Sequence, residues 1–67
     1  MLMVLVINGQ KQELKARTIQ DVIVHYGLAG KPIVVEADGA VLTAGEWETT
    51  TVRQDMQIEL VHFVGGG

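Results

Sequence analysis

The C-terminal end of the chain carries the group whose chemistry stands out most. The last three residues are Gly65, Gly66 and Gly67, so we expect the chain to end in a glycine carboxylate. Three extended residues reach roughly 10 Å, and without side chains they can pass through a narrow tunnel. Glycine loses more backbone entropy than other residues on being fixed, so this tail is expected to be flexible. Two interpretations are possible: a frayed end with no role, or a tail that presents the carboxylate of Gly67 to another protein's active site. The pattern favours the second.

The remaining reactive residue types do not combine into a catalytic site. The chain has no cysteine and no serine, so the two commonest nucleophiles and any thiolate metal site are absent. His25 and His62 lack metal-ligand spacing, and we interpret them as a helix-end residue and a partly packed residue at the rim of the core. Glu46 and Glu48 flank a tryptophan, but paired carboxylates need a substrate cleft that so small a domain hardly builds. We expect no catalytic residue, no metal and no bound cofactor.

Length and charge narrow the class of protein further. With 67 residues, 48% of them hydrophobic, the chain is expected to form one small globular domain, monomeric when free. A net charge of −3 argues against nucleic acid as a partner, because binding it requires clustered Lys and Arg. The apolar start, residues 1–7, is too short to span a membrane and has no basic leader. These features predict a cytoplasmic protein that binds neither nucleic acid nor membrane.

The first third of the chain predicts a β-hairpin. An aliphatic run over residues 2–7 is followed by Asn8-Gly9, the strongest short signal for a two-residue hairpin turn. Residues 10–16 would return as a polar edge strand, with Leu14 pointing inward. We therefore expect the chain to open with two antiparallel strands.

A short helix should follow the hairpin. Thr18 is typical of an N-cap, and Asp21 three residues later completes a capping-box-like pair. Gly27 suits the left-handed position after the helix, with Leu28 making the accompanying hydrophobic contact. Between these signals the spacing predicts a helix near residues 19–26 with one apolar stripe: Ile19, Val22, Ile23 and Tyr26.

The rest of the chain predicts strands around one irregular excursion. Asp38-Gly39 marks a second turn, and Trp47 is expected to anchor the polar excursion onto the core. The expected segments are strands at 33–37 and 40–42, the excursion at 43–51, a turn at 53–56 and a final strand at 57–64. One helix crossing a mixed sheet of four to five strands, with the first and last strands central and parallel, is an α+β, β-grasp (ubiquitin-like) arrangement. The domain would comprise residues 1–64, followed by the tail 65–67.

A single helix can cover only one face of such a sheet. The expected core residues on the covered side are Leu5, Ile7, Ile19, Val22, Ile23, Ile58 and Leu60. The alternating residues of the first and last strands are also apolar, which leaves an uncovered apolar face of the kind that usually marks an interaction site. We predict that this partner-docking face includes Val4, Val6, Val61 and Phe63.

The ending Val61-His62-Phe63-Val64-Gly65-Gly66-Gly67, with Asn8-Gly9 and Thr18-Ile19-Gln20-Asp21-Val22, resembles the sulfur-carrier proteins of thiamine (thiazole) biosynthesis. The resemblance implies that a ubiquitin-activating-type adenylyltransferase uses ATP to adenylate the carboxylate of Gly67, with Gly65 and Gly66 threading its active site. The adenylate would become a thiocarboxylate, with sulfur from a donor used by that enzyme. Thiazole synthase would then take the sulfur to form thiazole phosphate. The chain itself would be a cosubstrate, not an enzyme.

Two alternatives stay open. The small subunit of molybdopterin synthase resembles this chain in fold and diglycine end, although its members tend to be longer. A β-grasp module could instead bind proteins through its sheet face and carry an idle tail.

Overall fold

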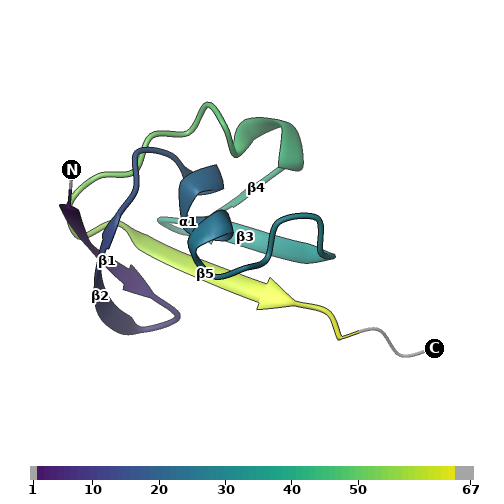
Figure 1. The fold of residues 1–67 in the computed structure, drawn as a ribbon, viewed down its shortest axis with the longest axis horizontal. Helices are drawn as coiled ribbons and strands as arrows, with labels where there is room; N and C mark the ends of the chain where they lie inside the picture. Colours follow the sequence, from purple (N-terminus) through teal and green to yellow (C-terminus); the bar gives the residue numbers. More distant parts are fainter. Residues whose placement is uncertain (1, 65–67) are drawn as a thin grey trace.

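The computed structural model describes residues 2–64 and contains a five-stranded sheet with one α-helix packed on it (Figure 1). The strand order is β2-β1-β5-β3-β4, and the adjacent interior strands β1 and β5 run parallel. This is the predicted α+β, β-grasp arrangement. In chain order the elements are β1 (Leu2–Ile7), β2 (Gln10–Lys15), α1 (Ile19–His25), β3 (Ile33–Ala37), β4 (Ala40–Leu42), the 3-10 helix η1 (Ala44–Glu46) and β5 (Gln57–His62).

Both predicted Asx-Gly turns form tight connections between antiparallel strands. Asn8 and Gly9 join β1 to β2 with φ angles of 50° and 82°, and Asp38 and Gly39 join β3 to β4 with 48° and 86°. Positive φ at both central residues matches the twist of a β-hairpin, and Asn, Asp and Gly tolerate it best. The two turns therefore set the registers of the two hairpins.

The N-terminal end of α1 is held by its cap and by the excursion that precedes β5. Thr18 and Asp21 form the predicted capping box: the Asp21 N–H donates to Thr18 Oγ1, and the Thr18 N–H donates to Asp21 Oδ2. The N–H groups of Ile19 and Gln20 donate to the carbonyls of Thr50 and Trp47 at 3.0 and 2.9 Å. The amides that an α-helix leaves unpaired at its start are thus satisfied by the excursion, which explains its place against the helix.

The C-terminal end of α1 has the expected glycine but a shorter apolar stripe. The Leu28 N–H donates to the Ile23 carbonyl and the Gly27 N–H to that of Val24, which is the Schellman pattern, with Gly27 at φ 70°. The helix ends at His25, and Tyr26 caps it with 38% of its surface exposed. The helix therefore ends one residue before the expected position, and Tyr26, the last residue of the expected apolar stripe, is only partly covered.

The core lies between α1 and one face of the sheet. All seven residues predicted for it are buried, and Leu5, Ile19, Val22 and Ile23 are fully inaccessible to solvent. Leu14 points inward as expected, and Trp47 is half-buried against this core. The full set of buried apolar residues is Leu5, Ile7, Leu14, Ala16, Ile19, Val22, Ile23, Val35, Ala37, Val52, Met56, Ile58 and Leu60.

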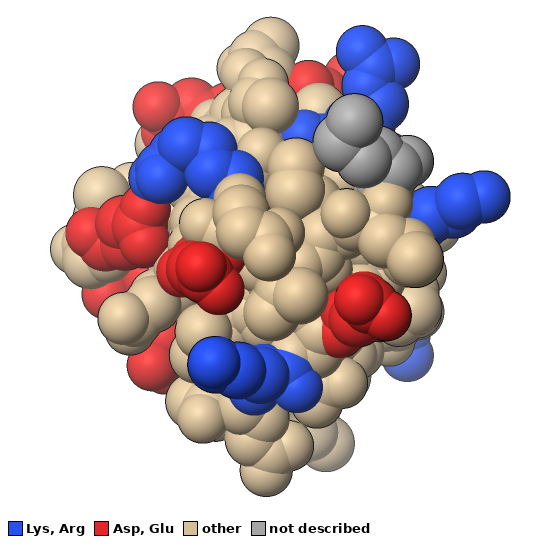
Figure 2. Space-filling view, turned by 90° about the vertical axis from the view of Figure 1, so that its left-hand side faces the viewer, with Lys and Arg blue, Asp and Glu red and all other residues tan. Residues whose placement is uncertain are grey.

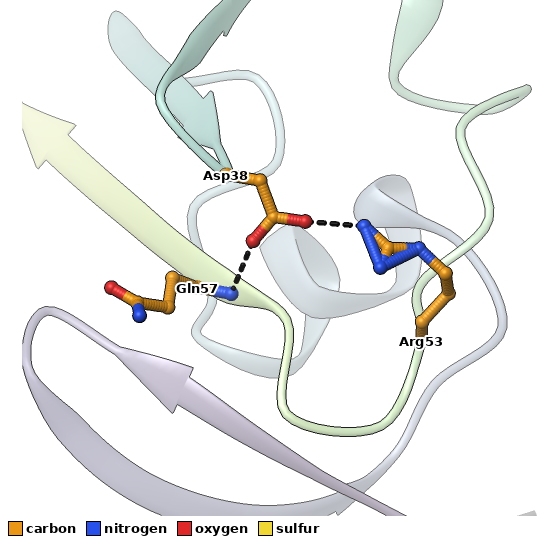
Figure 3. Close-up of polar contacts among 3 residues, drawn as sticks. All are labelled: Asp38, Arg53 and Gln57. Atoms are coloured by element: carbon orange, nitrogen blue, oxygen red, sulfur yellow. Dashed lines mark hydrogen bonds and ion pairs between the residues drawn. The ribbon is translucent and has the colours of Figure 1, made fainter.

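The start of β5 is tied to the β3–β4 turn by Asp38 (Figure 3). Asp38 Oδ1 accepts a hydrogen bond from the Gln57 N–H at 3.0 Å, and Oδ2 forms an ion pair with Arg53. The Asp38 N–H also donates to the Gln57 carbonyl at 2.7 Å. One turn residue therefore fixes both the position of β5 and the turn that leads into it.

The strand ends differ slightly from the sequence prediction. β2 stops at Lys15 and β5 at His62, where residues 16 and 64 were expected. His62 is exposed, so its interpretation as a partly packed residue at the rim of the core was wrong. It stands at the last position of β5, beyond Leu60, the last core residue of that strand.

Candidate functional site

The predicted reactive tail lies outside the described residues, but the strand that carries it is described to its end. Gly65, Gly66 and Gly67 follow Val64, the last described residue, which is 86% exposed. The preceding residue, Phe63, still donates its N–H to the Pro32 carbonyl at 3.0 Å. The folded body therefore holds the chain up to Phe63, two residues before the first tail glycine.

The strand leading to the tail lies in the middle of the sheet. β5 pairs with β3 from Ile58, opposite Ala37, to His62, opposite Ile33. On its other side it pairs in parallel with β1, where Ile7 lies opposite Ile58. The start of β5 is therefore held from both sides, whereas its tail-side end has backbone pairing with β3 alone.

The four predicted docking residues all belong to the uncovered face, but they form two separate groups. Val4 and Val6 alternate with buried Leu5 on β1, and Val61 and Phe63 alternate with Leu60 at the end of β5. Val6 lies opposite Gln57 in the parallel ladder. Val61 stands four positions further along β5, roughly 13 Å away at strand spacing.

Only one of the two groups lies beside the tail. Val61, 46% exposed, stands opposite Val34 of β3, and Phe63, 54% exposed, follows near the tail root. We call Val34, Val61 and Phe63 the tail-side cluster. Val4, Val6 and the exposed Leu2 lie at the opposite end of the sheet, where β5 begins.

A polar band that the sequence prediction missed separates the two apolar groups. Gln57 and Glu59 of β5 belong to the uncovered face, and Glu59 lies directly opposite Glu36 of β3. Two carboxylates opposite each other on neighbouring strands repel, which costs stability. Neither has a basic partner within residues 2–64, where the ion pair formed is that of Arg53 with Asp38. The register of β3 against β5 was the missing information, because the sequence alone places each glutamate on a face but not opposite the other.

Within residues 2–64, no three His, Asp or Glu side chains come close enough to hold a metal ion. A hollow of about 250 Å³ is lined by Met3, Ala16, Arg17, Thr51 and Val52, residues of β1 and of the junctions beside the start of α1. It lies at the end of the sheet away from the tail-side cluster and holds no pair of reactive side chains.

The carboxylates with shifted pKa values serve as caps. Hydrogen bonds from the backbone N–H groups of Arg17 and Thr18 lower the pKa of Asp21, which closes the capping box of α1. The backbone N–H and then the hydroxyl of Thr43 lower the pKa of Glu46 in the same way at η1. Both side chains are exposed, and both shifts follow from the local turn geometry.

Charge is dispersed on the face of the molecule that Figure 2 shows. Figure 2 turns the left-hand side of Figure 1 toward the viewer and shows basic side chains separated from one another by acidic and uncharged ones. A phosphate-binding surface would need these cations side by side. Across residues 2–64, neither helix is long and apolar enough to cross a membrane.

Comparison with known proteins identifies the family. The family model of the ThiS family matches residues 5–67, nearly the whole chain. The chain is 33% identical over 63 residues to the sulfur carrier protein ThiS of Bacillus subtilis, covering 91% of this chain and 96% of that protein. It is also 34% identical over 62 residues to a thiazole synthase of Magnetococcus marinus, covering 91% of this chain but only 19% of that longer protein.

Solved structures agree with the sequence match. The crystal structure of the thiamine biosynthesis protein ThiS from Geobacter metallireducens superimposes with a TM-score of 0.79 at 26% identity, covering 97% of this chain and all of the other. Its solution structure gives a TM-score of 0.80 at 26% identity, covering 97% of this chain and 88% of the other. The chain belongs to the ThiS family, the β-grasp sulfur-carrier proteins of thiamine biosynthesis.

Proposed function

We propose that the carboxylate of Gly67 is the group on which this protein carries sulfur. A carboxylate oxygen attacks the α-phosphorus of ATP, pyrophosphate leaves, and the glycine becomes an acyl adenylate. A sulfur nucleophile then attacks the acyl carbon and AMP leaves, so that the tail ends in a thiocarboxylate. The adenylation is necessary because a carboxylate oxygen is a poor leaving group and AMP is a good one.

The observation that carries the proposal is the family match, which runs to Gly67 and therefore includes the tail. Two features support it. The strand that leads to the tail lies between β1 and β3, and β3 and Pro32 hold it by backbone pairing up to Phe63. The chain also contains no cysteine, and a thiocarboxylate carries sulfur without one.

Two enzymes are proposed as partners. The first is a ubiquitin-activating-type adenylyltransferase that supplies the ATP site and uses the sulfur donor, with Gly65 and Gly66 threading its active site. The second is thiazole synthase, which takes the sulfur to form thiazole phosphate. The thiazole synthase of Magnetococcus marinus supports the second partner, because about a fifth of that polypeptide is similar to most of this chain. A carrier and its acceptor enzyme that occur in one polypeptide are expected to act together.

The docking surface is proposed to be the uncovered face of the sheet, with the tail-side cluster as its apolar centre. A protein surface that packs on Val61 and Phe63 also meets the carboxylates of Glu36 and Glu59. Basic side chains on the partner would relieve their mutual repulsion, so association should be faster at low ionic strength. The second apolar group, with Val4 and Val6, lies further from the tail and is expected to contribute less.

The protein is proposed to be a cytoplasmic monomer when free that binds no cofactor of its own. The small subunit of molybdopterin synthase becomes the less favoured alternative, because the matching model is that of the thiamine family. A binding module with an idle tail is the alternative that experiment must separate from a carrier.

The test is the intact mass of the purified protein after incubation with its activating enzyme, ATP and a sulfide source. A carrier gains the mass of one sulfur-for-oxygen exchange, and the gain requires ATP. A binding module keeps its mass under every condition. The control omits the enzyme: a mass gain in its absence would show that the sulfuration is not enzymatic.

A further inference from the structure

We infer that Asn8 is a positioning residue for the tail: its side-chain amide holds the last part of β5 and, through it, the tail-side cluster and the tail root. The expected effect on adenylation rests on the proposed function, whereas the hydrogen bonds of Asn8 do not depend on it. No sequence pattern assigned this role, since Asn8 was expected only as a turn residue.

The parallel ladder between β1 and β5 ends before β5 does. The Asn8 N–H donates to the Ile58 carbonyl at 2.9 Å, which is the last backbone bond between the two strands. At Asn8 the chain turns away with φ 50° to begin the hairpin, so its backbone leaves the edge of β5. Without another partner, the backbone N–H and carbonyl of Leu60, two residues further along β5, would be unpaired on the edge of β5 that β1 has left.

The Asn8 side chain takes the place of the missing strand. Its Oδ1 accepts a hydrogen bond from the Leu60 N–H at 2.8 Å, and its Nδ2 donates to the Leu60 carbonyl at 3.2 Å. A carboxamide carries one acceptor and one donor side as a peptide group does, so it can pair with both backbone groups of one residue. The ladder is thereby extended by one residue beyond the point where β1 ends.

The other Asx-Gly turn shows that the residue type matters. Asp38 has nearly the same φ, 48°, but its carboxylate can only accept, and it binds the Gln57 N–H and the Arg53 side chain. A carboxylate at position 8 could accept from the Leu60 N–H but would face the Leu60 carbonyl with a second acceptor. Both turns tolerate either side chain, so the amide of Asn8 is required by Leu60 and not by the turn.

Loss of this amide should loosen the end of β5 without unfolding the domain. Leu60 is three residues before Phe63, and only β3 would then hold this stretch. Val61 and Phe63 would be presented less rigidly, and the tail would leave from a mobile root. A reacting group that is held less precisely reacts more slowly, because the lost order must be regained in the productive complex.

The test compares Asn8→Gly with Thr18→Ala, which removes the cap of α1 at the other end of the molecule. Glycine tolerates the positive φ of the turn, so Asn8→Gly deletes the two hydrogen bonds and little else. Three quantities are measured for both variants and the unsubstituted protein: melting temperature, amide hydrogen exchange at Leu60, and kcat/KM for adenylation by the activating enzyme. Assays run well below the melting temperature of each variant.

Both variants should melt at a lower temperature, but only Asn8→Gly should speed exchange at Leu60 and lower kcat/KM, by roughly tenfold. Asn8→Asp keeps the hydrogen bond from the Leu60 N–H, so its exchange at Leu60 and its kcat/KM should lie between those of Asn8→Gly and the unsubstituted protein. It replaces Asn8→Gly in the test if that variant does not fold. Unchanged exchange at Leu60, or an equal kcat/KM in Asn8→Gly and Thr18→Ala, would overturn the inference. If the unsubstituted protein is not adenylated, the proposed function fails, while the exchange at Leu60 still decides whether Asn8 holds the strand.

Discussion

Truncation of Phe63 tests the docking surface with a magnitude that the structure supplies. Phe63 is 54% exposed and lies beside the tail root. Of the roughly 200 Å² that an aromatic side chain can bury, about 110 Å² is therefore available to a partner. At about 25 cal/mol per Å², burying it contributes about 2.7 kcal/mol. Ordering the side chain costs about 0.5–1.5 kcal/mol, so Phe63→Ala should weaken binding by about 1–2 kcal/mol.

That loss corresponds to a dissociation constant raised roughly 5- to 30-fold. Isothermal titration of the purified activating enzyme with each carrier variant measures it directly. Val24→Ala is the control, because Val24 is 56% exposed but lies on α1, away from the uncovered face. Melting curves of both variants show whether the fold is intact. A Phe63→Ala protein that is folded and binds as tightly as Val24→Ala would refute the assignment of the tail-side cluster to docking.

Three further outcomes are expected. Ile23→Val deletes one buried methylene and should lower the free energy of unfolding, measured with urea, by about 0.5–1.5 kcal/mol. Val24→Ala, at the neighbouring exposed position, should lower it less. The reverse order would show that the packing of α1 is misassigned. Gly66→Val should fold normally but lose adenylation, measured as ATP-dependent pyrophosphate release, because a β-branched residue adds bulk and restricts the tail backbone; full activity would contradict threading of the tail. Because the pKa of Asp21 is lowered in the folded protein, the unfolded chain is protonated first as pH falls. The contribution of Asp21 to stability is therefore complete above the ordinary carboxyl range and is lost below it. The melting temperature should fall on acidification, and less steeply in Asp21→Asn.

The local signals in this sequence predicted most of the fold. Asn8-Gly9 and Asp38-Gly39 predicted both turns, and Thr18 with Asp21 predicted the start of α1, because each of these features depends on neighbours within four residues. Gly27 likewise predicted the Schellman turn, and the helix end differs from the prediction by one residue, with Tyr26 as the C-cap.

Features that depend on strand register could not be predicted. Alternation along the sequence places Val6 and Val61 on the same face, but only the parallel pairing of Val6 with Gln57 shows that they lie far apart. Glu36 stands opposite Glu59 for the same reason. The two hydrogen bonds of Asn8 to Leu60 join residues 52 positions apart, and no pattern within either strand indicates them. The tail glycines lie outside the described residues, so their role stays a prediction.

The most direct test of the central claim is ATP–pyrophosphate exchange catalysed by the activating enzyme with the complete chain and with a chain that lacks Gly67. Deleting one residue shortens the tail by roughly 3.5 Å, which withdraws the carboxylate from the α-phosphate, while the sheet face that docks is unchanged. We expect the complete chain to support exchange and the shortened chain to bind the enzyme with the same affinity but support none. Exchange at the same rate with the shortened chain would show that the tail carboxylate is not the reacting group.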